Sequence, residues 1–153
     1  MASETSEEKV LIHNRKARHD FYIIETYEVG IVLKGTEVKS LRLGNANLLD
    51  SFAKIKGGEV WLENMHISPF DQASRNNHDP KRDRKLLLNK REIRRLNSKL
   101  QEEGTTLVPI QVYLKNNRIK VELAFARGKK MFDKREAIAK REVEREVKRK
   151  YGI

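Results

Sequence analysis

The sequence predicts a mainly β fold, namely a small antiparallel β-barrel with two or three flanking helices and a basic C-terminal tail. Six or seven short segments rich in β-branched and aromatic residues follow one another between turn signals. Helical periodicity is restricted to a few segments between these strands. Beyond Gly128 the strand pattern stops and lysine and arginine predominate. Many short strands in one small unit favour a sheet that closes on itself.

Composition limits the organisation of the chain to one domain with short extensions. We expect residues 1–9 to be disordered because they lack apolar periodicity, and residues 10–127 to form the barrel. Residues 128–153 carry ten Lys and Arg against five Asp and Glu, and we expect them to be disordered alone. Their apolar stripe is thin, since it consists of Ala139, Val143 and Val147. A plain solvated terminal helix is the alternative.

Charge indicates the kind of partner. The chain of 153 residues has 33 Lys and Arg against 22 Asp and Glu, a net charge of +11. Such an excess favours a polyanionic partner, either nucleic acid or an acidic membrane surface. The absence of cysteine fits a reducing cytosol. No window approaches 18 apolar residues and the N-terminus is acidic, so we expect a cytoplasmic protein without a membrane span.

The first half of the predicted barrel contains a strand-to-helix corner. The chain has a short apolar start at Val10–His13. Strands are expected at Asp20–Tyr27 and at Ile31–Leu33, joined near Gly30 as a long bent hairpin. Gly30 is expected to mark a bulge or a close approach of two chains.

The corner helix is expected to begin at Thr36 as N-cap and to end at Gly44. Glu37 then lies in the first turn, where the helix dipole favours an anion. Val38 and Leu41 share one face, and Lys39 and Arg42 point outward. The corner either closes the barrel or faces a ligand.

The second half contains two hairpins and the most strongly predicted helix. Gly57-Gly58 joins the strand ending at Lys56 to Glu59–Glu63, where Trp61 serves either as core or as a stacking platform. Asn89 and Glu92 form a capping box for a helix that we expect to end at Gly104. The apolar stripe of this helix is Ile93, Leu96 and Leu100. Leu107–Leu114, with a bulge or edge at Pro109, pairs with Arg118–Ala126 through the Asn116-Asn117 turn.

Two basic clusters are candidates for nucleic-acid contact. Asn14–His19 directly precedes a strand, so that its cations would be held in fixed geometry at the edge of a sheet. The alternative is a solvated loop. Lys81–Lys85 is the second cluster. We expect no cofactor and no metal, because the four histidines lack metal-ligand spacing and there is no Walker A, Gly-x-Ser-x-Gly or Gly-x-Gly-x-x-Gly motif. A binding protein is favoured over an enzyme.

Four stretches in order resemble the SmpB family of SsrA-binding proteins. They are Asn14–His19, Gly35–Arg42, Asp79-Pro80 with Arg84–Asn89, and Gly128–Lys130 with Asp133–Arg135. The similarity spans about residues 10–141. The resemblance implies an OB-like barrel and a role in trans-translation, the rescue of ribosomes stalled on messages that lack a stop codon. It implies that the barrel grips the tRNA-like domain of transfer-messenger RNA (tmRNA), and that the tail enters the empty message channel of the small subunit and folds there as a helix.

The resemblance also implies site residues. RNA contact falls to Asn14, Glu28 and Leu87, and charge and position add Lys16, Arg18, His19, Lys39, Arg84 and Lys85. The ribosome-binding tail comprises Gly128, Lys129, Lys130, Met131, Lys134, Arg135, Lys140, Arg141 and Arg145. Phe132 receives no role. We expect a monomer that binds tmRNA and the ribosome.

Three other classes of function stay open from the residues. A permanent structural protein of a ribonucleoprotein would have the same basic surface. A nucleic-acid enzyme would need a catalytic constellation, for which the sequence offers no obvious candidate. A membrane-surface tail is disfavoured because Ala139, Val143 and Val147 offer little apolar area.

Overall fold

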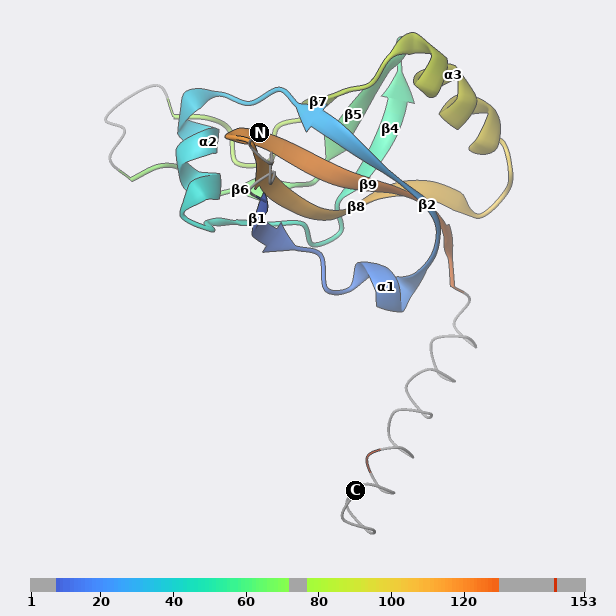
Figure 1. Cartoon of the computed structure of the whole chain (residues 1–153), viewed down its shortest axis with the longest axis horizontal. Helices are drawn as coiled ribbons and strands as arrows, with labels where there is room; N and C mark the ends of the chain where they lie inside the picture. Colours follow the sequence, from blue (N-terminus) through green and yellow to red (C-terminus); the bar gives the residue numbers. More distant parts are fainter. Residues whose placement is uncertain (1–7, 72–76, 130–144, 146–153) are drawn as a thin grey trace, which may run out of the picture.

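Strands make up most of the fold in the computed structural model, which describes residues 8–71, 77–129 and 145. The strands are β1 (Glu8–His13), β2 (Phe21–Ile31), β3 (Ala46–Asn47), β4 (Phe52–Lys56), β5 (Glu59–Glu63), β6 (His66–Ile67), β7 (Arg84–Leu87), β8 (Thr105–Lys115) and β9 (Arg118–Gly128). The helices are α1 (Ala17–Asp20), α2 (Gly35–Arg42) and α3 (Lys90–Lys99). Figure 1 shows α1, α2 and α3 at three separate places around the curved sheet. This confirms the prediction of a mainly β fold with flanking helices.

The main sheet is antiparallel and curls back on itself. Its strand order is β1-β8-β4-β5-β7-β2-β9, and β8 also pairs with β9. Two links in this ring are short: Ala53 of β4 pairs with Leu107 of β8, and Gly30 and Ile31 of β2 pair with β7. The barrel is therefore partly open and OB-like rather than fully closed. β1 begins at Glu8, two residues before the predicted start of the barrel.

Side chains along each strand alternate between inward-facing and outward-facing positions, and the inward-facing ones form the core. In β5, Val60 and Leu62 are fully buried, whereas Trp61 between them is half-buried on the opposite face. Because successive side chains of a strand point to opposite faces, Trp61 lies outside the core when Val60 and Leu62 point into it. The fully buried Leu41, Leu107 and Leu123 bring α2, β8 and β9 into the same cluster.

β2 is a single strand, and the predicted hairpin between residues 20 and 33 is wrong. β2 pairs with β9 from Phe21 opposite Gly128 to Gly30 opposite Lys120. Val29 and Gly30 therefore continue the ladder and do not turn. Gly30 does mark a close approach, because a Cβ there would lie 3.2 Å from Leu87 Cδ1.

The N-cap of α2 also differs from the prediction. The helix starts at Gly35, and its N-cap is the extended residue Lys34, two residues before the predicted N-cap Thr36. The backbone N–H of Lys34 donates to Glu37 Oε1 at 2.8 Å, which satisfies one N-terminal donor. Thr36 instead uses its hydroxyl to hydrogen-bond His78 Nδ1 at 2.8 Å. A tertiary contact has replaced the local cap that sequence reasoning assigned to Thr36.

The second half follows the sequence prediction closely. Glu92 N–H donates to Asn89 Oδ1 at 2.8 Å and Asn89 N–H donates to Glu92 Oε1 at 3.2 Å, the predicted capping box of α3. The helix ends at Lys99, five residues before its predicted end at Gly104, which lies in the turn that follows with φ of +81°. Positive φ at Asn116 and Asn117 fits the tight hairpin turn between β8 and β9. The β8 ladder is irregular next to Pro109, as predicted.

Within the described ranges, no helix is long and apolar enough to cross a membrane.

The α3 capping box leads to a stability prediction. Asn89→Ala should lower the free energy of unfolding by about 1 kcal/mol, because the first turn loses a side-chain acceptor for Glu92 N–H. Urea denaturation followed by circular dichroism measures the change. Asn97→Ala, on the exposed side of the same helix, is the control and should be neutral or slightly stabilising. Equal losses from both variants would contradict the capping role.

Candidate nucleic-acid interface

The predicted RNA-contact residues lie on separate parts of the barrel. Asn14, Lys16, Arg18 and His19 occupy the β1–α1 loop and α1, next to the start of β2. Glu28 lies near the other end of β2, where Gly30 pairs with Leu87. The structure therefore offers two surfaces, one at each end of this strand.

The first surface, here called the Asn14 patch, consists of Asn14, Lys16, Arg18, His19 and Lys129. Asn14 fixes it to the sheet, because its Nδ2 donates to the Pro109 carbonyl at 2.8 Å and its N–H donates to the Ile110 carbonyl at 2.8 Å. Lys16 and Arg18 are exposed and form no ion pair within the described part of the chain. These two cations are therefore available to phosphate.

The root of the C-terminal tail belongs to the same patch. Lys129 N–H donates to the Asp20 carbonyl at 2.9 Å, and Lys129 Nζ donates to the Arg18 carbonyl at 3.3 Å. The ammonium also lies 4.9 Å from the centre of the Tyr22 ring, within cation–π range. Gly128 N–H donates to the Gly104 carbonyl at 3.0 Å. The tail thus leaves the barrel from a fixed point, a role for the half-exposed Tyr22 that sequence reasoning missed.

Glu28 is held as a carboxylate by its neighbours on β8. Tyr113 OH donates to Glu28 Oε2 at 2.5 Å, and Lys115 Nζ lies 3.3 Å from the same oxygen. The hydrogen bond from Tyr113 lowers the pKa of Glu28. Burial, followed by the same hydrogen bond, raises the pKa of Tyr113. Glu28 is therefore ionised at neutral pH and is oriented by two strand neighbours.

The second surface, the Leu87 groove, has an apolar floor and a basic rim. Leu87 is 51% exposed and lies against Gly30. The groove encloses about 350 Å³, and its further lining includes Leu33, Val38, Arg42, Arg118 and Lys120. Arg118 and Lys120, on β9, were not singled out from the sequence, because only the β2–β9 register brings them beside Leu87.

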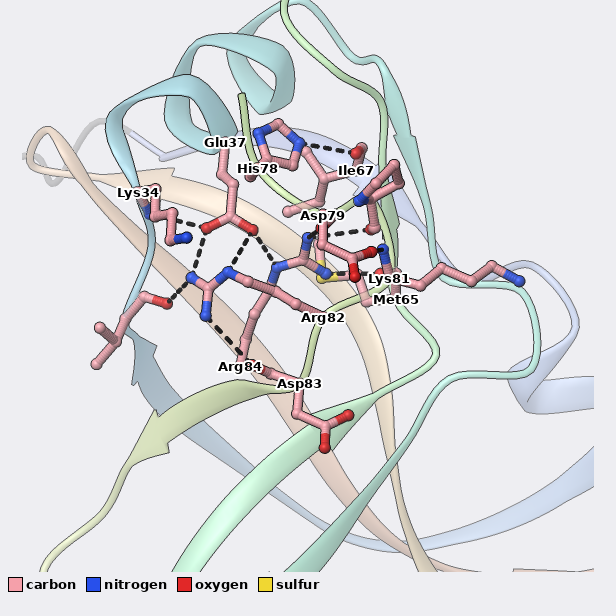
Figure 2. A network of polar contacts seen from close by, with 12 residues as sticks. Lys34, Glu37, Met65, Ile67, His78, Asp79, Lys81, Arg82, Asp83 and Arg84 are labelled. Atoms are coloured by element: carbon pink, nitrogen blue, oxygen red, sulfur yellow. Dashed lines mark hydrogen bonds and ion pairs between the residues drawn. The ribbon is translucent and has the colours of Figure 1, made fainter. Parts of the chain in front are cut away.

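The prediction that Arg84 contacts RNA is wrong, because its side chain is fully buried. Its Nε donates to Glu37 Oε2 at 2.5 Å and its Nη1 donates to the Met65 carbonyl at 2.6 Å. Its Nη2 donates to the Pro80 carbonyl at 3.1 Å. Figure 2 shows this guanidinium enclosed between α2 and the segment that leads into β7. One cation of the basic cluster Lys81–Lys85 therefore points into the protein interior.

The buried Glu37 carboxylate is the centre of this network. Arg82 Nη2 reaches Glu37 Oε1 at 2.5 Å and Arg82 Nε reaches Glu37 Oε2 at 3.0 Å, so the pair is bidentate. Arg84 and the Lys34 amide at the helix N-terminus also donate to Glu37, so both of its carboxylate oxygens accept hydrogen bonds (Figure 2). The network fastens α2 to the barrel. It thereby fixes the positions of Val38 and Arg42, two α2 residues in the lining of the Leu87 groove.

Two further predicted residues are not among those that define the Asn14 patch or line the Leu87 groove. Lys85 is half-buried and its Nζ pairs with Glu59 at 2.8 Å. Lys39 is exposed on α2, with its ammonium 5.3 Å from the centre of the Phe70 ring. Both keep their charge near solvent, so contact with RNA stays a prediction for them.

Most of the predicted tail residues lie outside the described residues. Those are Lys130, Met131, Lys134, Arg135, Lys140 and Arg141, and Phe132, to which no role is assigned, lies outside them as well. Arg145 is described and exposed. Within the described ranges, no group of three or more His, Cys, Asp or Glu side chains is placed to hold a metal ion.

The fold and these surfaces define a class: a small OB-like barrel with cationic patches at its edge, an architecture used repeatedly for binding nucleic acid. Comparison with known proteins makes the assignment specific. The profile described as SmpB protein matches residues 11–152, and this chain belongs to the SmpB family.

Individual relatives are similar along nearly their whole length. An SsrA-binding protein from Desulforudis audaxviator is 63% identical, and the match covers 93% of each chain. One from Geobacillus thermodenitrificans is 57% identical over 95% of this chain and 94% of its own. A chain solved in the structure “tmRNA-SmpB: a journey to the center of the bacterial ribosome” has 53% identity and a TM-score of 0.66. That match covers 78% of this chain and 84% of the solved one.

The buried ion network leads to a second stability prediction. Glu37→Gln should lower the free energy of unfolding by about 3–5 kcal/mol, because Arg84 would stay buried without a counter-charge. Glu59→Gln removes a carboxylate from the partly exposed pair with Lys85 and should cost less than about 1 kcal/mol. Guanidinium denaturation of both variants measures the difference. Similar small losses would show that the buried network contributes little.

The same carboxylate should make stability depend on pH. Burial works to raise the pKa of Glu37, but hydrogen bonds from Arg82, the Lys34 amide and Arg84 hold it below its ordinary value of 4.5. A lowered folded-state pKa contributes stability that is present above pH 4.5 and is lost as the pH falls through the lower value. Unfolding measured between pH 7 and pH 3 should show a steeper acid loss in the wild type than in Glu37→Gln. Parallel profiles would contradict this origin.

Proposed function

We propose that this protein is a non-catalytic RNA-binding adaptor of trans-translation. It binds the tRNA-like domain of tmRNA and delivers that RNA to stalled ribosomes, where its basic tail probes the empty message channel. The observation that carries the proposal is the match, at 53% identity, to a chain solved with tmRNA on the bacterial ribosome. The site of action is the cytoplasm, where stalled ribosomes are found.

The spacing of the two basic surfaces supports recognition of a folded RNA. The Asn14 patch and the Leu87 groove lie at opposite ends of β2, a strand of 11 residues that spans roughly 30 Å. Cations that far apart contact phosphates on different parts of one structured RNA. Glu28, an ordered carboxylate at an exposed position, adds an acceptor for base or ribose donors.

The fixed tail root supports a division of labour between body and tail. Lys129 is bound to the Asp20 and Arg18 carbonyls, so the cationic sequence beyond it begins beside the Asn14 patch. A cationic segment competes with a message for a channel lined by phosphate, and can enter only when the channel is empty. In this proposal the body selects tmRNA, and the tail, residues 128–153, tests whether the message channel is empty.

In this proposal the protein makes and breaks no covalent bond. Polar groups at both surfaces form hydrogen bonds within the protein, such as Asn14 with Pro109 and Glu28 with Tyr113, and these bonds fix the shape of the surfaces. Aminoacylation and peptidyl transfer belong to the synthetase and the ribosome. A permanent ribosomal component is the second candidate, and stoichiometric co-sedimentation with every ribosome would favour it.

Charge reversal tests the division of labour. Lys16→Glu with Arg18→Glu should weaken binding to the tRNA-like domain and reduce the slope of log affinity against log salt by about 2, since two phosphate contacts are lost. Lys134→Glu, Arg141→Glu and Arg145→Glu together should leave that affinity nearly intact and abolish tagging on stalled ribosomes. Filter binding at several salt concentrations and a reconstituted tagging assay measure the two effects.

Matched controls make this test decisive. Lys90→Glu with Arg91→Glu imposes the same change of charge on the exposed start of α3 and should reduce binding less than the patch variant. If the tail variant loses RNA affinity as severely as Asn14→Ala or Glu28→Ala, the division between body and tail is wrong. If the wild-type protein does not prefer the tRNA-like domain over an unrelated hairpin, the proposed function fails.

A further inference from the structure

The outward side of α3 carries four cations that pair with no acid in the described part of the chain. They are Lys90, Arg91, Arg94 and Arg95, and all four are exposed. Lys99, at the end of the helix, differs because its ammonium pairs with Glu25 of β2. We call the four cations the α3 face.

These charges are placed against the stability of the helix. Lys90 and Arg91 are its first two residues, where the helix dipole disfavours a cation. Arg91 and Arg95 are four residues apart, as are Lys90 and Arg94, and like charges at this spacing repel each other along a helix. A local preference that is violated without a compensating contact inside the protein is typical of a functional surface.

The helix holds the α3 face in a fixed position. The capping box of Asn89 and Glu92 orders its first turn, and Leu96 is buried in the main core. Lys99 Nζ donates to Tyr27 OH at 3.1 Å, which ties the last turn to β2. Because successive turns of an α-helix are about 5.4 Å apart, the four cations form two short parallel rows. Fixed rows of cations suit the repeated phosphates of a nucleic-acid backbone.

α3 and the Asn14 patch lie against opposite faces of β9. The ammonium of Lys99 lies 5.9 Å from the centre of the Phe125 ring, which belongs to the main core. Ala17 of α1 packs instead in a second cluster that contains Ala124. Neighbouring residues of a strand point to opposite faces, so α3 covers the inner face and α1 the outer face. Figure 1 shows the two helices far apart at the edge of the sheet.

The other candidate contacts for tmRNA also lie on the outer face. Leu87 is exposed whereas Leu86 is buried in the main core, and Glu28 is exposed whereas Val29 is buried there. An RNA held on these residues therefore approaches from the side opposite to α3. Lys90 follows Leu87 by three residues, so the arginines of the α3 face are the residues that separate the two sides best.

We propose that the α3 face binds the phosphate backbone of ribosomal RNA while the outer face of the barrel holds tmRNA. The proposal rests on the proposed adaptor function and extends it, since a protein that delivers one RNA to another gains from a basic surface for each. Phosphate is the partner that charge complementarity favours, because the cations of this face have no acidic partner among the described residues. Contacts of this kind position the protein and read no base sequence.

Binding to ribosomes without message tests the α3 face. Arg91→Gln, Arg94→Gln and Arg95→Gln together should lower the affinity of the full chain for these ribosomes about tenfold. The slope of log affinity against log salt should fall by about 2–3, since up to three phosphate contacts are lost. Affinity for the isolated tRNA-like domain should change by about twofold or less. Fluorescence anisotropy of the labelled protein at several salt concentrations measures both affinities.

A matched control separates a local contact from net charge. Lys9→Gln, Lys34→Gln and Lys54→Gln remove the same number of positive charges at exposed positions elsewhere on the barrel. This variant should keep its ribosome affinity within about threefold of the wild type. Equal losses in both variants, or no loss in the arginine variant, would overturn the proposal. A loss of affinity for the tRNA-like domain as large as in the Asn14 patch variant would assign the α3 face to tmRNA and would overturn it too.

Thermal unfolding of the free protein separates binding from folding. Glutamine has nearly the helix propensity of arginine, and its neutral side chain removes the repulsion between Arg91 and Arg95. The unfolding midpoint of the arginine variant should therefore stay equal or rise by about 1–3 °C. A lower midpoint would mean that the arginines serve the fold, and would oppose the proposal.

Crosslinking identifies the partner of the α3 face. Ser98 is exposed and lies one turn beyond Arg94 and Arg95. With Ser98 replaced by the photoreactive p-benzoylphenylalanine, the protein is irradiated on stalled ribosomes with tmRNA. Crosslinks to ribosomal RNA support the proposal, whereas crosslinks only to tmRNA, only to ribosomal protein, or none, oppose it. If the tRNA-like domain is still bound tightly while the α3 face fails these tests, the adaptor function stands and only this contact is lost.

Discussion

The buried carboxylate of Glu37 is the constraint on which the arrangement of the surface depends. Two guanidinium groups, from Arg82 and Arg84, and one helix N-terminal amide converge on it. A charge without a partner in the interior is costly, so these groups must stay together. The network joins α2 to the segment that precedes β7, two parts of the chain more than 40 residues apart. It therefore works as a tertiary clamp, and the position of the surface cations on α2 follows from it.

The two candidate surfaces, the Asn14 patch and the Leu87 groove, differ in construction. The Asn14 patch is built on a loop that hydrogen-bonds to an irregular position in β8, and it gathers cations from both ends of the chain. The Leu87 groove is built on strand register, which brings β7 and β9 against opposite edges of β2. The first surface is thus polar and tied down by backbone carbonyls. The second has an apolar floor, which favours a ribose or base over a phosphate.

Sequence reasoning succeeded where the physical cause is local. The capping box of Asn89 and Glu92 and the Asn116-Asn117 turn need only neighbouring residues, and both are present. It failed where distant partners decide the outcome. The basic sequence neighbours of Arg84 predict a surface position, yet its guanidinium is buried, because it hydrogen-bonds to Glu37 and to three backbone carbonyls. Thr36 is predicted to cap α2, but its hydroxyl forms a hydrogen bond with His78 instead.

The candidate site shows the same limit. Asn14, Lys16 and Arg18 were found because they are contiguous in a basic cluster that directly precedes a strand. Arg118 and Lys120 were missed, since only the pairing of β9 with β2 places them beside Leu87. Features made by residues that are neighbours in sequence can be predicted from the sequence, whereas surfaces made by distant residues depend on how the strands pair.

The place of β9 in the ring has a consequence for how the protein is made. β9 is the last strand of the barrel, yet it pairs along its length with β2 and also with β8. A growing chain therefore carries an unpaired β2 edge until residue 128 has been synthesised. Such long-range pairings are slow to form and leave strand edges open to association in the meantime. The barrel can close only near the end of synthesis, so a truncated product that lacks β9 would be recognised by the cell as unfolded.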